Sequence, residues 1–260
     1  MLKERIMYRD NLIIGNNVKE KKFFILKIMI IWPSLYLPII LFLFHFEIIY
    51  PYQNIFGLIP FLLYFPLLII ILFSAFILSL LFFTKCFLLL FNLIHDPKEG
   101  LFKMSLRNSD YLFYVLRNNI KNFVLEIFDY FPLPWAKILP MKLFNITIPN
   151  STGMLDSYID NEFIIFGKES ILGEGSMVLS STIINGYLLI KKTIIGDRVT
   201  IGAYTTVSPG TIVEPETILG MGSYTKINQK LERRSIYVGR PAHKIEKIEN
   251  DSINNNPNIK

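Results

Sequence analysis

The stretch Ile194–Ile212 is Ile-Ile-Gly-Asp-Arg-Val-Thr-Ile-Gly-Ala-Tyr-Thr-Thr-Val-Ser-Pro-Gly-Thr-Ile, and its apolar residues recur at every sixth position. The same spacing extends in both directions, through Phe166, Leu172, Val178, Ile184, Ile195, Ile201, Val207, Val213 and Leu219. A period of six does not fit an amphipathic helix and is too long for the alternation of one strand. It predicts a three-sided solenoid in which each six residues form a short strand and a corner.

The two runs of sixes are out of phase. Phe166 and Ile195 are 29 residues apart (195 − 166), one short of a multiple of six. We therefore predict a loop at Asn185–Thr193 that interrupts one coil. Glycine often follows the apolar residue, and we expect it to turn the corner with a positive φ. Residues 148–230 then predict roughly four coils, above the three or so that a stable solenoid needs.

The first third of the chain has a different composition. The chain is 52% hydrophobic and 18% charged, and residues 28–46 and 48–84 contain no Asp, Glu, Lys or Arg. A bilayer core about 30 Å thick is crossed by roughly 20 apolar helical residues. We predict a transmembrane hairpin over 28–84, with helices at 28–49 and 60–83 that prolines kink. A signal peptide is excluded because the charged leader is long and a second apolar span follows at once.

Basic residues flank this hairpin but are absent from its loop. Residues 1–27 hold seven Lys or Arg and residues 85–142 hold eight, whereas the loop carries only Glu47. The distribution predicts an integral membrane protein with two spans and both termini in the cytoplasm. We expect a basic cytoplasmic leader (1–27), the hairpin (28–84), a membrane-proximal helical linker (85–147), the solenoid (148–246) and a disordered tail (247–260).

The linker contains an amphipathic pattern. Its apolar stripe is Leu112, Leu116, Ile120, Phe123 and Ile127, and Arg107, Arg117 and Lys121 fall outside that stripe. Two interpretations stay open. The helix lies among lipid headgroups with its basic groups towards anionic lipid, or it packs on the following domain.

Three motifs carry a family resemblance. Ile194–Ile212, Leu219-Gly-Met-Gly-Ser223 and Tyr237-Val-Gly-Arg-Pro-Ala-His-Lys-Ile245 resemble the hexapeptide-repeat acyltransferases, whose fold is a left-handed parallel β-helix. The resemblance covers residues 148–246, so the chain is expected to be an α+β membrane protein ending in such a β-helix. It implies acyl transfer from acyl-CoA to a hydroxyl or amine, in a homotrimer with sites between subunits.

A looser resemblance extends towards the N-terminus. The segments 132–135, 144–149 and 156–163 look like the C-terminal membrane region of epsilon-poly-lysine synthetase-like proteins, in which hexapeptide domains alternate with membrane helices. The family resemblance also points to four coenzyme-binding residues: Ala203 and Ser223 through their backbone groups, and Lys226 and His243.

The general base of the family, a histidine in mid-solenoid, is missing. Where the synthetase-like relatives carry it, this chain has Thr182, and threonine is a poor base at neutral pH. Three carboxylates before the first clear coil are candidate replacements: Asp156, Asp160 and Glu162, with Glu162 the first choice. Crowded carboxylates raise one another's pKa, which suits acid–base work. The alternative is a turn in which Asp and Asn side chains bond their own backbone.

Other functions are excluded by composition. One cysteine and three histidines without zinc spacing predict neither a disulfide nor a metal site. A γ-type carbonic anhydrase needs three histidines on zinc, and a nucleotidyltransferase needs a nucleotide-binding domain where the apolar helices lie. The net charge of +6 is too diffuse to predict nucleic-acid binding.

Two hypotheses follow. The first is a membrane-anchored acyltransferase that moves an acetyl or other acyl group from CoA to a membrane lipid or lipid-linked acceptor on the cytoplasmic face. The second is a non-catalytic trimeric β-helix scaffold that has lost the base.

Overall fold

The computed structural model describes residues 20–49, 55–131 and 134–247 of the 260-residue chain. They belong to two units. The helical unit is Asn17–Asp96 with Leu116–Tyr130, and the solenoid unit includes Pro97–Val115 and Phe131–Lys260. Most of the predicted leader and nearly all of the predicted tail lie outside the described residues.

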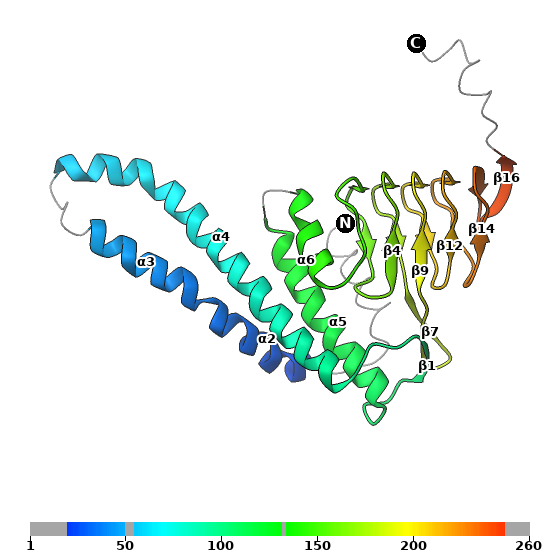
Figure 1. The fold of residues 1–260 in the computed structure, drawn as a ribbon, viewed down its shortest axis with the longest axis horizontal. Coiled ribbons are helices and arrows are strands. Elements are labelled where there is room, and N and C mark those ends of the chain that lie inside the picture. Colours follow the sequence, from blue (N-terminus) through cyan, green and yellow to red (C-terminus); the bar gives the residue numbers. More distant parts are fainter. Residues whose placement is uncertain (1–19, 50–54, 132–133, 248–260) are drawn as a thin grey trace, which may run out of the picture. The chain divides into compact units, whose positions relative to one another are not determined.

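The helical unit contains α2 (Glu20–Ser34), α3 (Tyr36–Ile49) and α4 (Ile55–Ile94), with α2 and α3 running along α4 (Figure 1). The helix is interrupted at Leu35, between α2 and α3 and beside Pro33 and Pro38. Proline has no N–H to donate, so both prolines remove helical hydrogen bonds across this break. The predicted kink at this point is confirmed.

The second apolar helix is longer than predicted. α4 begins before Pro60 and continues past residue 84 to Ile94. The helix continues through Lys85, because a lysine side chain is long enough to place its ammonium group beyond an apolar surface. Two segments, Phe24–Phe46 and Leu62–Ile94, are long and apolar enough to cross a membrane. Many of their large side chains are exposed, including Leu63 and Ile70.

The solenoid unit is a three-sided parallel β-helix. Sheet 1 contains β2 (Gly153–Met154), β5 (Ile171–Leu172), β10 (Thr200–Ile201), β13 (Ile218–Leu219) and β15 (Ser235–Val238). Sheet 2 contains β3 (Tyr158–Ile159), β6 (Met177–Val178) and β11 (Thr206–Val207). Sheet 3 contains β4 (Ile164–Phe166), β9 (Thr193–Ile195), β12 (Ile212–Val213) and β14 (Lys230–Leu231). The final strand, β16 (His243–Lys247), pairs antiparallel with β15.

The strand register confirms the period of six. Thr200 pairs with Ile218 and Ile212 pairs with Lys230, each one coil of three sixes further along the chain. The apolar residue of each six points inward and is almost completely buried, as at Leu172, Ile201, Val207, Val213 and Leu219. The hydrophobic interior is therefore one continuous column through the coils.

The predicted interruption is also confirmed, and it is a β-hairpin. β7 (Ser181–Ile184) and β8 (Tyr187–Ile190) pair antiparallel around Asn185-Gly186. Both turn residues have positive φ, 47° and 78°, as a two-residue hairpin turn requires. Ile184, which fell on the period of six, is an exposed hairpin residue instead of an inward one.

The hairpin pairs with a strand from before the solenoid. β1 (Gly100–Lys103) runs antiparallel to β8, which gives a three-stranded sheet in the order β1-β8-β7. The buried core beside it contains Tyr111, Tyr114, Leu188 and Ile190. Glu99 accepts a hydrogen bond from the backbone N–H of Lys192 at 2.9 Å. The linker is thus tied to the solenoid through the interrupting hairpin.

The burial of the basic residues of the linker helix speaks against one of its two interpretations, the one at the lipid headgroups. The linker helix is α5 (Ser109–Phe128), and η2 (Pro134–Lys137) and α6 (Ile138–Leu143) follow it. Within α5, Arg117 and Lys121 are buried, with 2% and 4% of their surface exposed. Arg117 donates to the carbonyl oxygen of His95 at 3.3 Å. Of the predicted apolar stripe only Ile120 is fully buried. These two basic groups therefore do not face anionic lipid, because polar partners hold them inside.

The corner glycines have a different role from the one expected. Gly173 and Gly202 do not have positive φ; residues two positions later, Gly175 and Tyr204, do. A Cβ on Gly202 would lie 2.5 Å from the backbone nitrogen of Met221 on the next coil. Glycine is needed there because neighbouring coils approach too closely for any side chain.

We expect Gly202→Ala to lower the free energy of unfolding by about 1–3 kcal/mol, because the added methyl group forces two coils apart. Urea unfolding of the full chain in detergent micelles measures the change. Gly153→Ala is the matched control, since its Cβ would lie 3.8 Å from a side chain of Ile171. Equal stability of the two variants would contradict this interpretation of the corners.

Candidate functional site

The corners of the β-helix form three columns, each built from successive coils. Hydrogen bonds between stacked residues define them, such as Gly222 N–H to Ala203 O at 2.8 Å and Asn228 N–H to Pro209 O at 3.0 Å. Corner 1 contains Asp156, Gly173–Gly175, Gly202–Tyr204 and Gly220–Gly222. Corner 2 contains Asp160–Phe163, Ser180, Ser208–Gly210 and Lys226–Asn228. Corner 3 contains Gly167–Glu169, Gly196–Arg198, Glu214–Glu216 and Glu232–Arg234.

Asp160 on corner 2 lies at the centre of a buried hydrogen-bond network. Its Oδ2 accepts from the backbone N–H groups of Ser180 and Ser181, both at 2.9 Å. The hydroxyls of Ser181 and Ser180 also donate to Oδ2, at 2.9 and 3.3 Å. Oδ1 accepts from the Tyr158 hydroxyl at 3.1 Å. The carboxylate is only 4% exposed and is surrounded by donors.

The network extends from Asp160 to the linker helix. The Tyr114 hydroxyl donates to Ser181 Oγ at 2.8 Å. Burial raises the pKa of Asp160, and the hydrogen bonds from Ser180, Ser181 and Tyr158 act in the opposite direction. Ser180 and Ser181 are the residues at which the chain leaves the coil for the hairpin. Asp160 therefore cross-links the start of the hairpin to the preceding coil.

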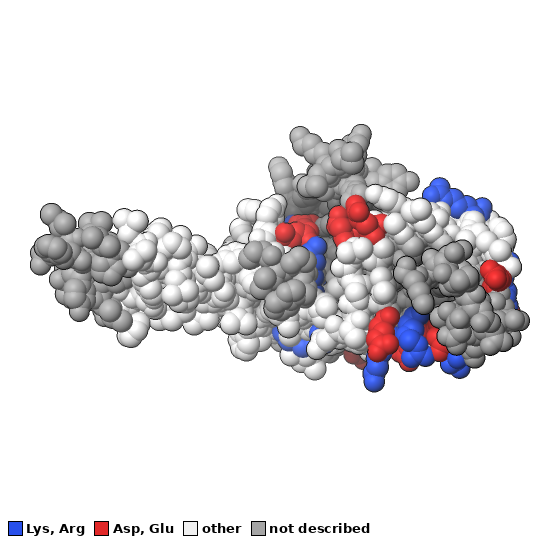
Figure 2. All heavy atoms as spheres, turned by 90° about the horizontal axis from the view of Figure 1, so that it is seen from above, with Lys and Arg blue, Asp and Glu red and all other residues white. Residues whose placement is uncertain are grey.

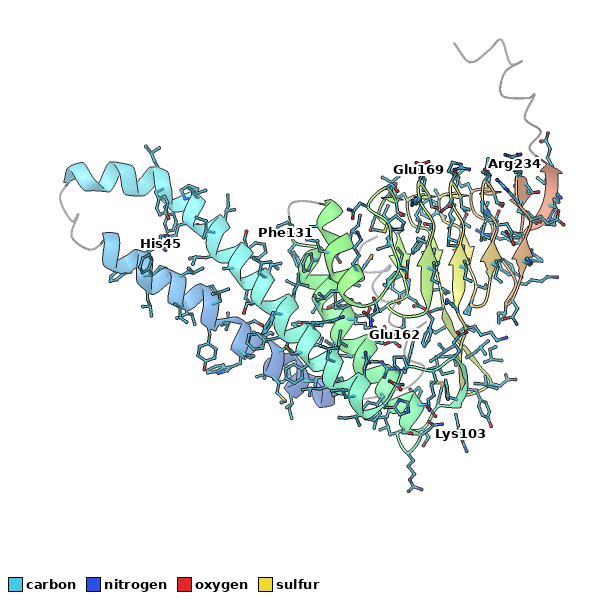
Figure 3. The ribbon with its side chains drawn as sticks, in the orientation of Figure 1. His45, Lys103, Phe131, Glu162, Glu169 and Arg234 are labelled. Atoms are coloured by element: carbon cyan, nitrogen blue, oxygen red, sulfur yellow. The ribbon has the colours of Figure 1, made fainter. Side chains whose placement is uncertain are left out.

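The three predicted carboxylates do not converge. The carbonyl of Asp156 accepts from Gly175 N–H at 2.7 Å, so Asp156 belongs to corner 1, where it is exposed. Glu162 is on corner 2, two residues after Asp160, and is 7% exposed. It lies at the first-coil end of the solenoid, with Arg234 at the last-coil end (Figure 3). Glu162 as a general base stays a prediction, and the crowding of three carboxylates is not observed.

Three of the four predicted coenzyme residues lie close together. Ala203 is partly exposed on corner 1, and Ser223 directly follows the next coil of that corner. Ser223 is 2% exposed, and its Oγ accepts from Gly239 N–H at 3.1 Å. His243 is exposed at the start of β16 and pairs with Val238 beside Gly239. Lys226 is apart from them, exposed on corner 2.

Corner 1 also offers backbone donors. Among the described residues, no backbone hydrogen bond uses the N–H of Ala203 or of Met221, which stack on successive coils. By contrast, Ser223 N–H donates to Gly220 O at 3.3 Å. We therefore take the N–H groups of Ala203 and Met221 as candidate donors to a ligand at corner 1. Met221 was not identified from the sequence, although it occupies the position of Ala203 one coil later.

Corner 3 contains an ion network that the sequence analysis missed. Glu216 pairs with Arg198, Arg233 and Arg234, which lower the pKa of its carboxyl to about 2. Arg198, Glu216 and Arg234 occupy the same place on three successive coils. The coil period was therefore the signal that could have found this network. Within the described residues, no group of three or more His, Cys, Asp or Glu side chains could hold a metal ion.

No protein-family model and no curated protein matches the chain. The solved structures similar to it include a maltose O-acetyltransferase from Clostridium difficile 630, with 15% identity and a TM-score of 0.45, covering 52% of this chain and 88% of that one. A hexapeptide-repeat containing acetyltransferase from Vibrio cholerae has 9% identity and a TM-score of 0.43, covering 51% and 91%. A galactoside acetyltransferase in complex with coenzyme A has 14% identity and a TM-score of 0.43, covering 54% and 84%.

We expect Asp160→Asn to lower the free energy of unfolding by about 1–3 kcal/mol, because an amide cannot accept all the hydrogen bonds now made to the carboxylate. Asp156→Asn, an exposed carboxylate four residues away, should change stability by less than about 0.5 kcal/mol. A double-mutant cycle with Ser181→Ala should show coupling between residues 160 and 181. Additive effects of Asp160→Asn and Ser181→Ala would contradict the cross-link.

Proposed function

We propose that the protein is a membrane-anchored acyltransferase that moves an acyl group, acetyl first, from CoA to a hydroxyl or amine of a membrane-associated acceptor on the cytoplasmic face. The observation that carries the proposal is the pair of stacked N–H donors of Ala203 and Met221 on corner 1. The acyl-CoA arm contains amide carbonyls that such donors bind, and a row of oriented backbone dipoles stabilises charge that develops on a thioester oxygen.

The groups beside these donors fit the rest of the coenzyme. His243 is exposed at the start of β16, next to the last coil of corner 1, whereas the neighbouring Lys244 pairs with Glu232 of corner 3. Arg240 lies on the same corner and donates to the carbonyl of Gly222 at 2.5 Å. Basic side chains of this kind bind phosphate groups through charge-assisted hydrogen bonds. We therefore orient the nucleotide end of the coenzyme towards the C-terminal coils.

The general base would come from a second copy of the chain. Glu162 is on corner 2, whereas the proposed coenzyme donors are on corner 1, and one β-helix cannot bring two of its corners together. Cyclic association of identical subunits places different faces of neighbouring copies side by side. We therefore propose a homotrimer of left-handed β-helices, with corner 1 of one copy and corner 2 of its neighbour forming each site.

In this site Glu162 takes the proton of the acceptor hydroxyl or amine as that group attacks the thioester carbonyl. The carbon–sulfur bond then breaks, the acyl group stays on the acceptor, and the coenzyme leaves as its thiol after taking up the proton. Atoms and charge balance without a metal or a redox partner.

The anchor is supported by the surface of the helical unit. The described part of the helical unit that contains α3 and most of α4 is almost free of charged side chains (Figure 2). Large apolar side chains are exposed along both candidate spans, such as Phe44, Leu63 and Ile70. In water such a surface would be unfavourable, while in a bilayer it faces lipid. We propose two spans with both termini in the cytoplasm, which keeps the solenoid beside a lipid-held acceptor.

The second candidate function, a non-catalytic trimeric scaffold, is favoured by a specific observation. Asp160 is occupied by hydrogen bonds that position the hairpin. His243, the last histidine of the chain, lies after the last coil. Glu162 is the other predicted carboxylate on corner 2, and the scaffold hypothesis holds if Glu162 has no chemical role.

We expect Glu162→Gln to lower the turnover of acetyl-CoA by about 10²–10⁴-fold, because removing a general base costs this much. The measurement follows radiolabelled acetyl transfer by the full chain in lipid nanodiscs to a total membrane lipid extract. Equilibrium dialysis measures acetyl-CoA binding, which should be unchanged. Glu169→Gln, which changes an exposed carboxylate on corner 3, is the matched control and should leave turnover unchanged. His243→Asn should mainly weaken coenzyme affinity.

Mixed assemblies test the site between copies. Glu162→Gln chains co-assembled with Ala203→Asp chains should regain part of the activity, because some sites then combine two intact corners. A site within one chain would give no recovery. If no acetyl-CoA binds and no acyl transfer is detected, the scaffold function replaces the enzyme.

A further inference from the structure

The three-stranded sheet β1-β8-β7 has two different faces. Phe102, Leu188 and Ile183 share one face, and this face packs against the core that contains Tyr111 and Tyr114. The other face, which we call the outer face, begins with the cross-strand row Leu101–Leu189–Thr182. Its second row is Lys103–Tyr187–Ile184.

The outer face is apolar with a basic edge. Leu101 is 59% exposed, Tyr187 is 42% exposed and Ile184 is 39% exposed. Lys103 is exposed in the same row, and an exposed Leu106-Arg107 pair follows it in the chain. Aliphatic side chains, a tyrosine and two basic groups together are typical of surfaces that lie at the boundary between lipid acyl chains and headgroups.

The chain itself keeps the outer face near the end of a candidate span. The apolar segment Leu62–Ile94 ends six residues before Gly100, the first residue of β1. At no more than about 3.6 Å per residue, this link holds β1 within about 22 Å of the end of the span. This short link is the reason for choosing lipid as the occupant of the outer face.

We propose that the outer face docks on the membrane surface. Leu101, Ile184 and Tyr187 lie at the acyl-chain boundary, and Lys103 and Arg107 bind the phosphates of anionic lipids. This inference rests on the membrane anchor of the proposed function and extends it, because it assigns the surface of the solenoid unit that faces the bilayer. It differs from the expectation for α5, whose Arg117 and Lys121 are buried.

Docking at this surface would orient the whole solenoid unit. The hairpin is fixed to the coils through the Asp160 network and to the linker through β1. In the solenoid unit, Lys103 lies at the edge opposite the one that carries Glu169 and Arg234 (Figure 3). Corner 3 therefore points away from the lipid when the outer face is docked.

The test uses single-cysteine variants of the full chain on a Cys86→Ser background, labelled with a nitrobenzoxadiazole fluorophore. The chain is reconstituted into nanodiscs of phosphatidylcholine and phosphatidylglycerol with headgroup spin-labelled or acyl-chain spin-labelled lipid. Labels at Leu101→Cys and Tyr187→Cys should be quenched by shallow spin labels at least three-fold more than a label at Glu169→Cys. A label at Ile70→Cys, inside the candidate span, should be quenched by deep spin labels.

A charge-matched pair of variants tests the basic edge. Lys103→Glu with Arg107→Glu should lower the quenching at Tyr187→Cys in phosphatidylglycerol nanodiscs. Lys168→Glu with Lys230→Glu, which changes the net charge equally at other exposed lysines, should leave that quenching unchanged. The same effect from both pairs would overturn the assignment of Lys103 and Arg107.

The outcomes separate this inference from the anchor. If Ile70 is quenched but residues 101 and 187 are no more quenched than residue 169, the outer face does not meet lipid and the inference is wrong while the anchor stands. If Ile70 is not quenched by deep labels, the anchor is wrong and the inference fails with it. Cross-links between copies through Leu101→Cys, without quenching, would show that a second copy covers the face.

Discussion

Close stacking of successive coils is the constraint on which the rest of the solenoid unit depends. A Cβ at Gly173 or Gly202 would lie 2.5 Å from the backbone nitrogen of the residue stacked on it. The same closeness aligns the inward apolar residues into one column and places corner residues directly above one another. The corner 1 donors, the Asp160 network and the corner 3 ion network all result from this alignment.

Corner 2 departs from the regular stacking of coils, because a β-hairpin is inserted there. At corner 2 the chain leaves the coil at Ser180, forms the hairpin β7–β8 and returns at Lys191. Asp160 on the preceding coil binds both N–H groups at the departure point. A buried carboxylate is unfavourable unless donors surround it, so this network fixes where the hairpin begins. β1 then pairs with β8 and joins the linker to the solenoid.

Sequence reasoning predicted the repetitive part of the fold because a period of six is a local pattern. It placed Leu172, Ile201 and Val213 inward and located the interruption near Asn185. It did not predict the strand partner of the hairpin, because β1 and β8 are far apart in sequence and each is a short apolar segment without a distinguishing signal. The same reasoning left two interpretations of α5 open, because the burial of Arg117 depends on a carbonyl 22 residues away.

For the candidate site, the residue types were recognisable but their neighbours were not. Asp156, Asp160 and Glu162 are close in sequence, yet β3 separates Asp156 on corner 1 from the other two on corner 2. The donors of Asp160 lie on the next coil, about one repeat later. Applying the coil period to Arg198 would have pointed to Glu216 and Arg234, whereas one coil after Asp160 falls just short of Ser180 and Ser181. A single polar residue becomes informative once it is compared with the residues one coil before and one coil after it.

The central claim is that the interrupting hairpin ties the linker strand to the β-helix. Hydrogen–deuterium exchange of the full chain in nanodiscs, read by mass spectrometry, tests it directly. The account predicts that peptides covering β1 and β8 exchange as slowly as those covering β10 and β13, because paired and buried amides open only with the surrounding structure. Exchange of β1 within seconds, while the coils stay protected, would contradict it.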